Sequence, residues 1–224
     1  ALATSDIERV AAIDSHITAA ILSKWPDSPT LSYVDFDWRK HDPPPEWLTA
    51  IYEEEFLQLG TPIGFINPSG DTIIPIGEYH YCCGDSIGYF GVVAHPWKAI
   101  NRKGEVLFKV LNTVSGEPYP DHLRYGMIRI EDENGKIGYA NYRGEIVIEP
   151  QFEWASSFYK NVAIIGQKCK EVVWWHDEMC RHSYISCGEY GFINRKGEIQ
   201  KVGKVSFGEV AAKIGWEPEE EEEW

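Results

Sequence analysis

A four-residue phrase with Asn at its first position and Gly at its fourth occurs four times in this chain, and this repetition constrains the fold more than any other feature. Asn suits the first position of a type I turn, and Gly suits the fourth. Apolar residues flank each copy, so the phrase predicts four β-hairpins within an internal repeat of about 35–40 residues. The copies are Asn67-Pro68-Ser69-Gly70, Asn101-Arg102-Lys103-Gly104, Asn141-Tyr142-Arg143-Gly144 and Asn194-Arg195-Lys196-Gly197.

A second phrase follows each hairpin and consists of an aromatic residue or Leu and then a short apolar run. It occupies residues 89–94, 123–130, 158–165 and 207–214. Each repeat unit is therefore predicted to contain three strands, of which this apolar run is the third. The last run, within residues 205–215, is expected to complete the fourth unit. Three strands cannot bury a hydrophobic face alone, so neighbouring units must stack or surround an axis.

These units resemble the bacterial WG-repeat family, which is named for a Trp-Gly pair at the head of each unit. The third unit fits the family pattern well over residues 138–152, and the resemblance covers about residues 61–215. It implies a β-repeat architecture and transfers no catalytic residues, because the family has none that are agreed. The Gly position holds Lys98 in the second unit. The Trp position holds Ile63, Trp97, Ile137 and Tyr190.

The predicted fold is mainly β, with four three-stranded antiparallel units that form either a propeller-like ring or an open solenoid. Residues 1–60 are predicted to form an N-terminal helical cap, with helices at 5–25 and 45–58 that cover the first edge of the array. Residues 61–216 are the predicted repeat domain, which contains an insertion at residues 167–188.

The chain is acidic, with 35 acidic and 21 basic residues and a formal net charge of −14. Residues 217–224 contribute to this charge and are predicted to be a disordered acidic tail. The charge argues against binding to nucleic acid or to anionic membrane surfaces, and it favours a basic protein as partner. No uninterrupted apolar stretch is long enough to span a bilayer, so a soluble protein without membrane insertion is expected.

The insertion at residues 167–188 is the predicted partner-binding surface. Insertions into repeats emerge on one face of the array, and this is often the binding face. Exposed Trp and Tyr side chains are common hot spots for binding. The predicted contact residues are Trp174, Trp175, His176, Asp177, Glu178 and Tyr184.

Five cysteines cannot form a fully paired disulfide framework. The insertion alone allows a metal site, a disulfide such as Cys169–Cys180, or unpaired thiols packed as small apolar groups, and the last of these is favoured. The residues concerned are Cys169, His176, Cys180, His182 and Cys187. Two further cysteines, Cys82 and Cys83, would point to opposite faces of a strand. No metal or cofactor is predicted.

The residues favour a non-enzymatic protein-interaction module in the bacterial cytoplasm, with the periplasm or secretion left open. One version is an immunity or antitoxin-like protein that captures a basic partner by electrostatic attraction. The alternative, suggested by 30 aromatic residues, is an envelope or secreted protein that binds glycans. A hydrolase is third, because Gly84-Asp85-Ser86-Ile87-Gly88 satisfies G-x-S-x-G, but no strand–turn–helix pattern surrounds Ser86.

Overall fold

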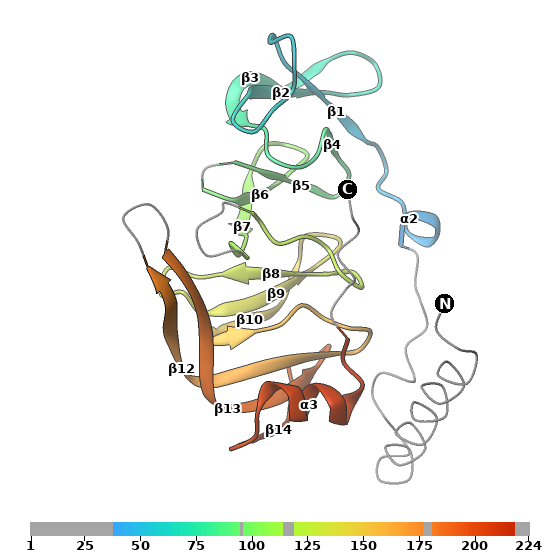
Figure 1. The fold of residues 1–224 in the computed structure, drawn as a ribbon. Helices are drawn as coiled ribbons and strands as arrows, with labels where there is room; N and C mark the ends of the chain where they lie inside the picture. Colours follow the sequence, from blue (N-terminus) through green and yellow to red (C-terminus); the bar gives the residue numbers. More distant parts are fainter. Residues whose placement is uncertain (1–37, 95, 114–118, 177–180, 218–224) are drawn as a thin grey trace, which may run out of the picture.

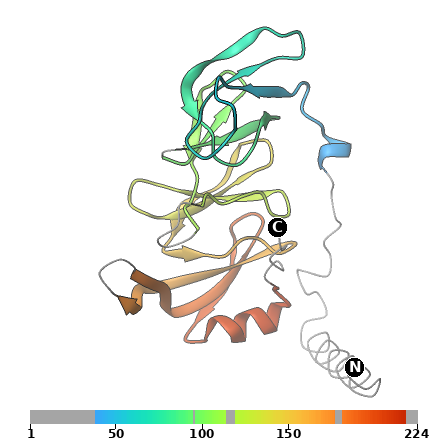
Figure 2. The same cartoon turned by 45° about the horizontal axis from the view of Figure 1, so that its top comes forward.

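The computed structural model describes residues 38–94, 96–113, 119–176 and 181–217. Over these residues the protein is mainly β, as the sequence predicts. Four antiparallel sheets follow one another along the chain and lie one below the next in Figure 1. The first and last sheets lie at opposite ends of this column, and Figure 2 shows the same arrangement from another side. The array is therefore an open stack.

Each sheet is built around one repeat unit of three strands joined by short connections. The first sheet has the order β3-β2-β1-β4, with β1 (Leu48–Ile51), β2 (Pro62–Ile66), β3 (Thr72–His80) and β4 (Ser86–Ile87). The second contains β5 (Phe90–Val93), β6 (Lys98–Asn101) and β7 (Val106–Lys109). The third contains β8 (Met127–Glu131), β9 (Ile137–Asn141) and β10 (Ile146–Phe152). The fourth has the order β11-β12-β13-β14, with β11 (Trp154–Ala155), β12 (Val162–His176), β13 (Arg181–Asn194) and β14 (Ile199–Gly203).

The prediction of four three-stranded units is wrong in the number of strands in a sheet and in which strands share a sheet. The first and fourth sheets have four strands each, because the two-residue strands β4 and β11 join them. The apolar run after each hairpin belongs to the next sheet, since β5, β8 and β12 pair with β6, β9 and β13. A short antiparallel connection to the following strand outcompetes pairing with the preceding hairpin, because sequence-local pairing costs less loop entropy.

The last apolar run is a helix, α3 (Phe207–Ile214), and not the predicted third strand of unit four. In the described residues this run pairs with no strand and instead packs against the fourth sheet. Ser206 caps the helix, and Glu209 completes a capping box with the Ser206 backbone N–H. Val210 and Ile214 pack against the apolar face of the fourth sheet.

The N-terminal helical cap is not observed in the described residues. The predicted helix at 5–25 lies outside them. Within the predicted helix at 45–58 the structure has strand β1, which pairs with β2 and supplies the first strand of unit one. The one N-terminal helix described is the four-residue α2 (Trp38–His41). The helix that covers an end of the described stack is therefore α3, at the C-terminal end (Figure 1).

Each interface between successive sheets holds its own apolar cluster. The first joins Ile63, Phe65 and Ile74 of unit one to Ile100 of unit two, and the second joins units two and three. In the third, fully buried Tyr139 donates a hydrogen bond of 2.6 Å to the Ser156 carbonyl oxygen. The fourth lies between the last sheet and α3 and contains Val162, Ile164, Phe192, Val210 and Ile214. A repeat unit cannot bury its apolar face alone, so each unit buries that face against its neighbour.

The Asn-x-x-Gly phrases form the predicted hairpin turns. In each turn the Gly N–H donates to the Asn carbonyl oxygen, and the Asn side chain accepts N–H groups two and four residues later. The four glycines have φ between +76° and +87°, which only Gly adopts without strain. In a fifth turn, between β8 and β9, the side chain of Asp132 accepts the N–H groups two and four residues later, as Asn does in the other turns.

Residues 38–47, here called the strap, cross the turns of units two and three. Asp42 accepts hydrogen bonds from the hydroxyls of Tyr89 and Tyr142, at 3.1 and 2.8 Å, and from Arg143 Nε at 2.7 Å. Glu46 forms an ion pair with Arg102 of the second turn. The strap thus ties residues far apart in the sequence to neighbouring repeat turns.

We expect Asp42→Ala to loosen the strap in a pH-dependent way. The hydrogen bond from Tyr142, with those from Arg143 and Tyr89, holds the pKa of Asp42 below its usual value. A group whose pKa is lower in the folded than in the unfolded state stabilises the fold at pH values above its unfolded pKa, which is about 3.9 for Asp. This stabilisation is lost as the pH falls through the folded pKa. The difference in melting temperature from wild type should therefore be larger at about pH 7 than at about pH 3. Equal differences at both pH values would contradict this, and exposed Glu133→Ala is the control.

Candidate functional site

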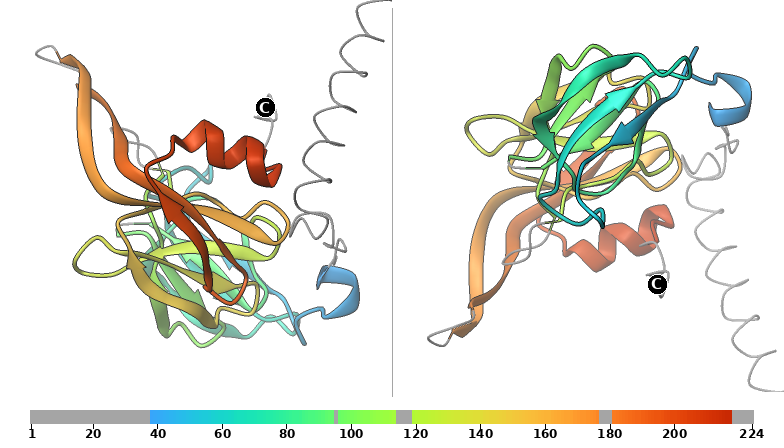
Figure 3. Two further views of the ribbon diagram at one scale, coloured as in Figure 1. Left: turned by 90° about the horizontal axis from the view of Figure 1, so that it is seen from below. Right: turned by 90° about the horizontal axis from the view of Figure 1, so that it is seen from above.

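The most unusual element of the stack is the first hairpin of unit four. Strand β12 has 15 residues and β13 has 14, whereas the equivalent strands β8 and β9 of unit three have five each. Residues 162–166 and 190–194 correspond to the ordinary hairpin, and the predicted insertion, residues 167–188, is its extension. This extension, here called the arm, projects away from the stack (Figures 1 and 3).

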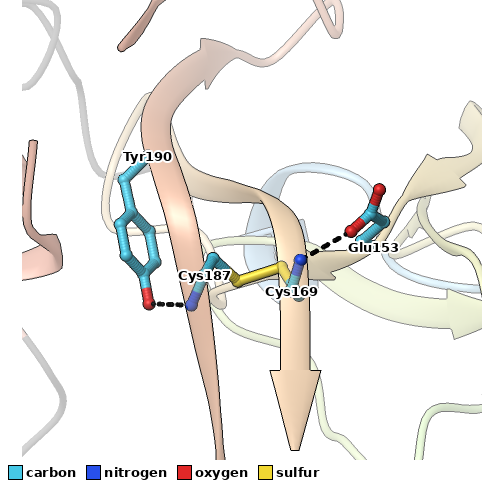
Figure 4. The surroundings of a disulfide bond; sticks show 4 residues. All are labelled: Glu153, Cys169, Cys187 and Tyr190. Atoms are coloured by element: carbon cyan, nitrogen blue, oxygen red, sulfur yellow. Dashed lines mark hydrogen bonds between the residues drawn. A yellow bond between two sulfur atoms is a disulfide. The ribbon is translucent and has the colours of Figure 1, made fainter. Parts of the chain in front are cut away.

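A disulfide joins the two strands at the base of the arm. Cys169 and Cys187 are register partners in β12 and β13 and are bonded through their sulfur atoms (Figure 4). The Cys169 N–H donates to Glu153 Oε2 at 2.8 Å, and the Cys187 N–H donates to the Tyr190 hydroxyl at 3.0 Å. The arm is thus held to the body of the fourth sheet on both strands.

This pairing differs from the sequence-based options. Unpaired thiols were favoured, and the disulfide considered was Cys169–Cys180, in which Cys180 lies outside the described residues. Because Cys169 and Cys187 are now bonded to each other, neither is free to complete the metal set that the sequence allowed. A usable signal was present, since the two cysteines lie near the start and near the end of the predicted insertion at residues 167–188.

A groove of about 250 Å³ lies between the base of the arm and the β8–β9 turn. Asn134 and Gly135 of that turn form one wall, and Cys169 and Ile185 contribute from the arm. The lining contains two cationic and two anionic side chains, namely Lys136, Lys170, Glu153 and Glu171. The groove therefore offers charges of both signs beside apolar surface.

The arm exposes apolar side chains at the edge of the groove and beyond it. Tyr184 is 55% exposed, and Val173 and Ile185 are each 43% exposed. Glu171 lies opposite Ile185 and accepts a hydrogen bond of 2.5 Å from the Ser183 hydroxyl. By the register of the two strands, Val173 and Ile185 lie on one face of the arm and Tyr184 lies on the other. Exposed apolar and tyrosine side chains on a projecting strand pair are suited to contact with another molecule.

The structure describes four of the six predicted contact residues. Tyr184 lies on the arm and is exposed. Trp174, Trp175 and His176 belong to the far part of β12, where Trp175 pairs with His182 and His176 pairs with Arg181. Asp177 and Glu178 lie outside the described residues. Sequence reasoning missed Val173 and Ile185 as exposed apolar groups, although alternation along the strand could have indicated them.

The sequence also singles out the reactive side chains of Ser86, Cys82 and Cys83. Ser86 lies in the short antiparallel strand β4 opposite Thr49 of β1, and not in a strand-to-helix turn. Cys82 and Cys83 lie between β3 and β4 in a non-strand segment, where their sulfur atoms are 2.6 Å apart. The expectation of opposite faces applied to a strand, so it does not apply to this segment. In the described part of the chain no three His, Cys, Asp or Glu side chains gather as metal ligands.

The acidic charge of the chain is unevenly distributed. Residues 61–216 contain 18 acidic and 17 basic side chains, so the repeat domain is nearly neutral. Residues 1–60 contain 11 acidic and 4 basic side chains, and residues 217–224 contain 6 acidic and no basic ones. Attraction of a cationic molecule would therefore come from the two flanks of the repeat domain.

Comparison with known proteins identifies one family. Residues 137–168 match the model of the family described as WG containing repeat. The matched segment starts with β9 and continues through β10 and β11 into β12, so it spans two neighbouring sheets. This confirms the resemblance derived from the repeated phrases. No curated protein and no solved structure matches the chain. No helix among the described residues is long and apolar enough to cross a membrane.

Proposed function

We propose that this WG-repeat protein is a protein-interaction module whose partner contacts the arm. The observation that carries the proposal is the extension of one hairpin to 15 and 14 residues, although the ordinary unit needs about five. The extension makes no use of the repeat core, because its apolar side chains Val173, Tyr184 and Ile185 are exposed. Packing within the stack does not explain such a structure, whereas a contact surface does.

The disulfide gives the arm a property that favours binding. Cys169–Cys187 and the Lys168–Glu189 ion pair at 2.5 Å hold its base in one geometry before any partner arrives. Binding by an ordered surface avoids part of the entropy that a flexible loop loses on association. A preorganised two-stranded arm with an exposed tyrosine therefore supports the assignment of Tyr184 to the contact surface.

A basic partner remains part of the proposal, with its attraction assigned to the acidic flanks of the repeat domain. Long-range attraction between opposite charges accelerates association and weakens as salt is added. The immunity or antitoxin-like version rests only on this charge. Glycan binding stays a prediction; the described aromatic rings that lie in edge-to-face pairs, such as Trp154 with Tyr190 and Phe207, are engaged in packing.

We also propose that the protein works in an oxidising compartment. Structural disulfides persist outside the cytoplasm and are rare within it. Cys169 and Cys187 face each other in register, so the bond follows from the strand pairing itself. This supports the periplasmic or secreted alternative over the cytoplasmic prediction. Mass analysis of protein isolated from its natural source without reductant tests it, because two free thiols at these positions would contradict it.

The arm proposal predicts that Tyr184→Ala weakens partner binding by about tenfold or more, as expected for a tyrosine hot spot. The experiment captures partners from the natural source at low and moderate salt, identifies the protein retained, and measures its Kd by titration. The control is Tyr119→Ala, which removes a 61% exposed tyrosine elsewhere on the stack. Equal affinities of the wild type and Tyr184→Ala would exclude this residue from the interface. Retention that does not change with salt would argue against the acidic flanks.

A further inference from the structure

Two adjacent thiols lie in the connection between units one and two. Cys82 and Cys83 follow β3, and their Sγ atoms are 2.6 Å apart. A sulfur–sulfur bond is about 2.05 Å long, so movement of only about 0.6 Å separates this arrangement from a covalent one. We propose that Cys82 and Cys83 are a redox-active dithiol that a small-molecule disulfide oxidises to a disulfide between adjacent residues.

The two thiols differ in their surroundings, and this difference assigns their roles. Cys83 is exposed, so an oxidant can reach it from solvent. Cys82 is half-buried against the cluster between units two and three, and its thiol lies 3.2 Å from the Val92 carbonyl oxygen of β5. The attacking thiol is therefore Cys83, and Cys82 is the thiol that closes the ring.

The hydrogen bond between the two sulfurs supports this order. The interaction with the Cys82 sulfur lowers the pKa of Cys83 below its ordinary value, although partial desolvation opposes the shift. The same hydrogen bond, together with burial, raises the pKa of Cys82. The thiolate is the nucleophilic form of cysteine, so the exposed sulfur is also the one that more readily carries the charge.

The reaction balances as ordinary thiol–disulfide exchange. The Cys83 thiolate attacks one sulfur of the oxidant, forms a mixed disulfide and releases the first thiolate of the oxidant. The Cys82 thiol loses its proton to solvent and attacks the Cys83 sulfur, which forms the Cys82–Cys83 bond and releases the second thiolate. The protein loses two electrons and two protons, and the oxidant becomes two thiols.

The product is expected to be easily reduced. Adjacent Cα atoms are about 3.8 Å apart across a trans peptide bond, which is shorter than the usual span of about 4.4–6.8 Å for a disulfide. A ring closed over so short a span is strained, and strained or exposed disulfides are the labile ones. The Cys82–Cys83 pair therefore suits reversible oxidation.

The test uses the full-length chain and oxidised glutathione as the probe. Cleavage after Lys and Arg releases residues 41–98, which contain Cys82 and Cys83 and no other cysteine. After exposure to excess oxidised glutathione, this peptide should lose the mass of two hydrogen atoms and retain no glutathione. Mild reductant should restore the original mass. Cys82→Ser should stop at a stable glutathione adduct on Cys83, and Cys83→Ser should react at least about tenfold more slowly than wild type.

Two results would overturn the proposal. The first is a wild-type peptide that keeps one or two glutathione groups, since ring closure would then not follow the first exchange. The second is a wild-type peptide that remains a dithiol under conditions in which free cysteine is oxidised. Both outcomes are read from the wild-type protein, so the conclusion does not depend on correct folding of either variant.

Discussion

Replacement of Asp121 by Ala is expected to lower the free energy of unfolding by about 3–5 kcal/mol, because it leaves a buried guanidinium without its counter-ion. The Asp121 side chain is 2% exposed and that of Arg129 is 15% exposed. Asp121 Oδ1 accepts from Arg129 Nη2 at 2.7 Å, and Oδ2 accepts from Nε at 3.1 Å and from the Arg129 backbone N–H at 2.7 Å. One carboxylate thus satisfies three donors.

The same arginine also links two units. Arg129 of β8 donates through Nη1 to the carbonyl oxygen of Ala155 in β11, at 3.2 Å. Burial acts to lower the pKa of Arg129, but the charge and hydrogen bonds of Asp121 outweigh it, and the pKa lies above its ordinary value. A guanidinium is not deprotonated in proteins, so Arg129 stays charged in Asp121→Ala, and the penalty is expected at the junction of units three and four.

Denaturant unfolding followed by circular dichroism measures this loss. The informative control is the double variant Asp121→Leu with Arg129→Met, which replaces the ion pair by apolar groups. Such replacements are often neutral or stabilising, so the double variant should recover much of the stability lost in Asp121→Ala. If the double variant is no more stable than Asp121→Ala, the loss of stability does not come only from the unpaired charge of Arg129. The geometry of the ion pair itself then also contributes.

The second large effect is expected for Gly138→Ala, at about 3 kcal/mol of unfolding free energy. A β-carbon at Gly138 would lie 2.4 Å from the Ile148 carbonyl oxygen and 2.6 Å from the Pro150 nitrogen. Both are backbone atoms of β10, so no side-chain rotation relieves the contact. For a chain of this length the melting temperature should fall by about 6–12 °C.

The control for this prediction is Gly203→Ala. Gly203 ends β14, and no atom lies within 4 Å of the position of an added β-carbon. Its substitution should change stability by no more than about 0.5 kcal/mol. Thermal unfolding of both variants under the same conditions compares them directly. Similar losses in both would mean that the close approach of β10 does not determine the need for glycine.

The same geometry explains why unit two tolerates Lys98 in the Gly position. In unit three the register of β9 and β10 shifts between Tyr139↔Ile148 and Ile137↔Phe152, so β10 bulges toward Gly138. Unit one has the equivalent shift beside Gly64, where an added β-carbon would lie 2.5 Å from the Ile74 carbonyl oxygen. In unit two Lys98 and Ala99 pair with Lys109 and Phe108 in succession. The register shift of unit two comes only after Ala99, so no bulge faces Lys98 and the lysine has room.

The sequence predicts where in the chain the candidate site lies, but it predicts only some of the contacts and exposed residues of that site. Repetition in the sequence shows where residues 167–188 interrupt the pattern, and this is where the arm lies. The Cys169–Cys187 bond and the exposure of Val173 and Ile185 depend on strand register. A register shift of one residue moves every side chain to the opposite face, and along the arm both strands are exposed, so burial of one face specifies the register only weakly. The strap contacts of Asp42 join residues about 100 positions apart, beyond the reach of any local pattern.

By itself, the sequence determined the hairpins, since the Asn-x-x-Gly turns depend on contacts within five residues. It also determined the mainly β class and the repeat length. Only the tertiary structure decided which strands share a sheet, because each apolar run can pair with the hairpin before it or with the one after it. It likewise decided that residues 48–51 form a strand and that 207–214 form a helix. The physical reason is that backbone groups must be satisfied in either state: residues 48–51 pair with β2, whereas residues 207–214 bond within a capped helix and bury Val210 and Ile214 against the fourth sheet.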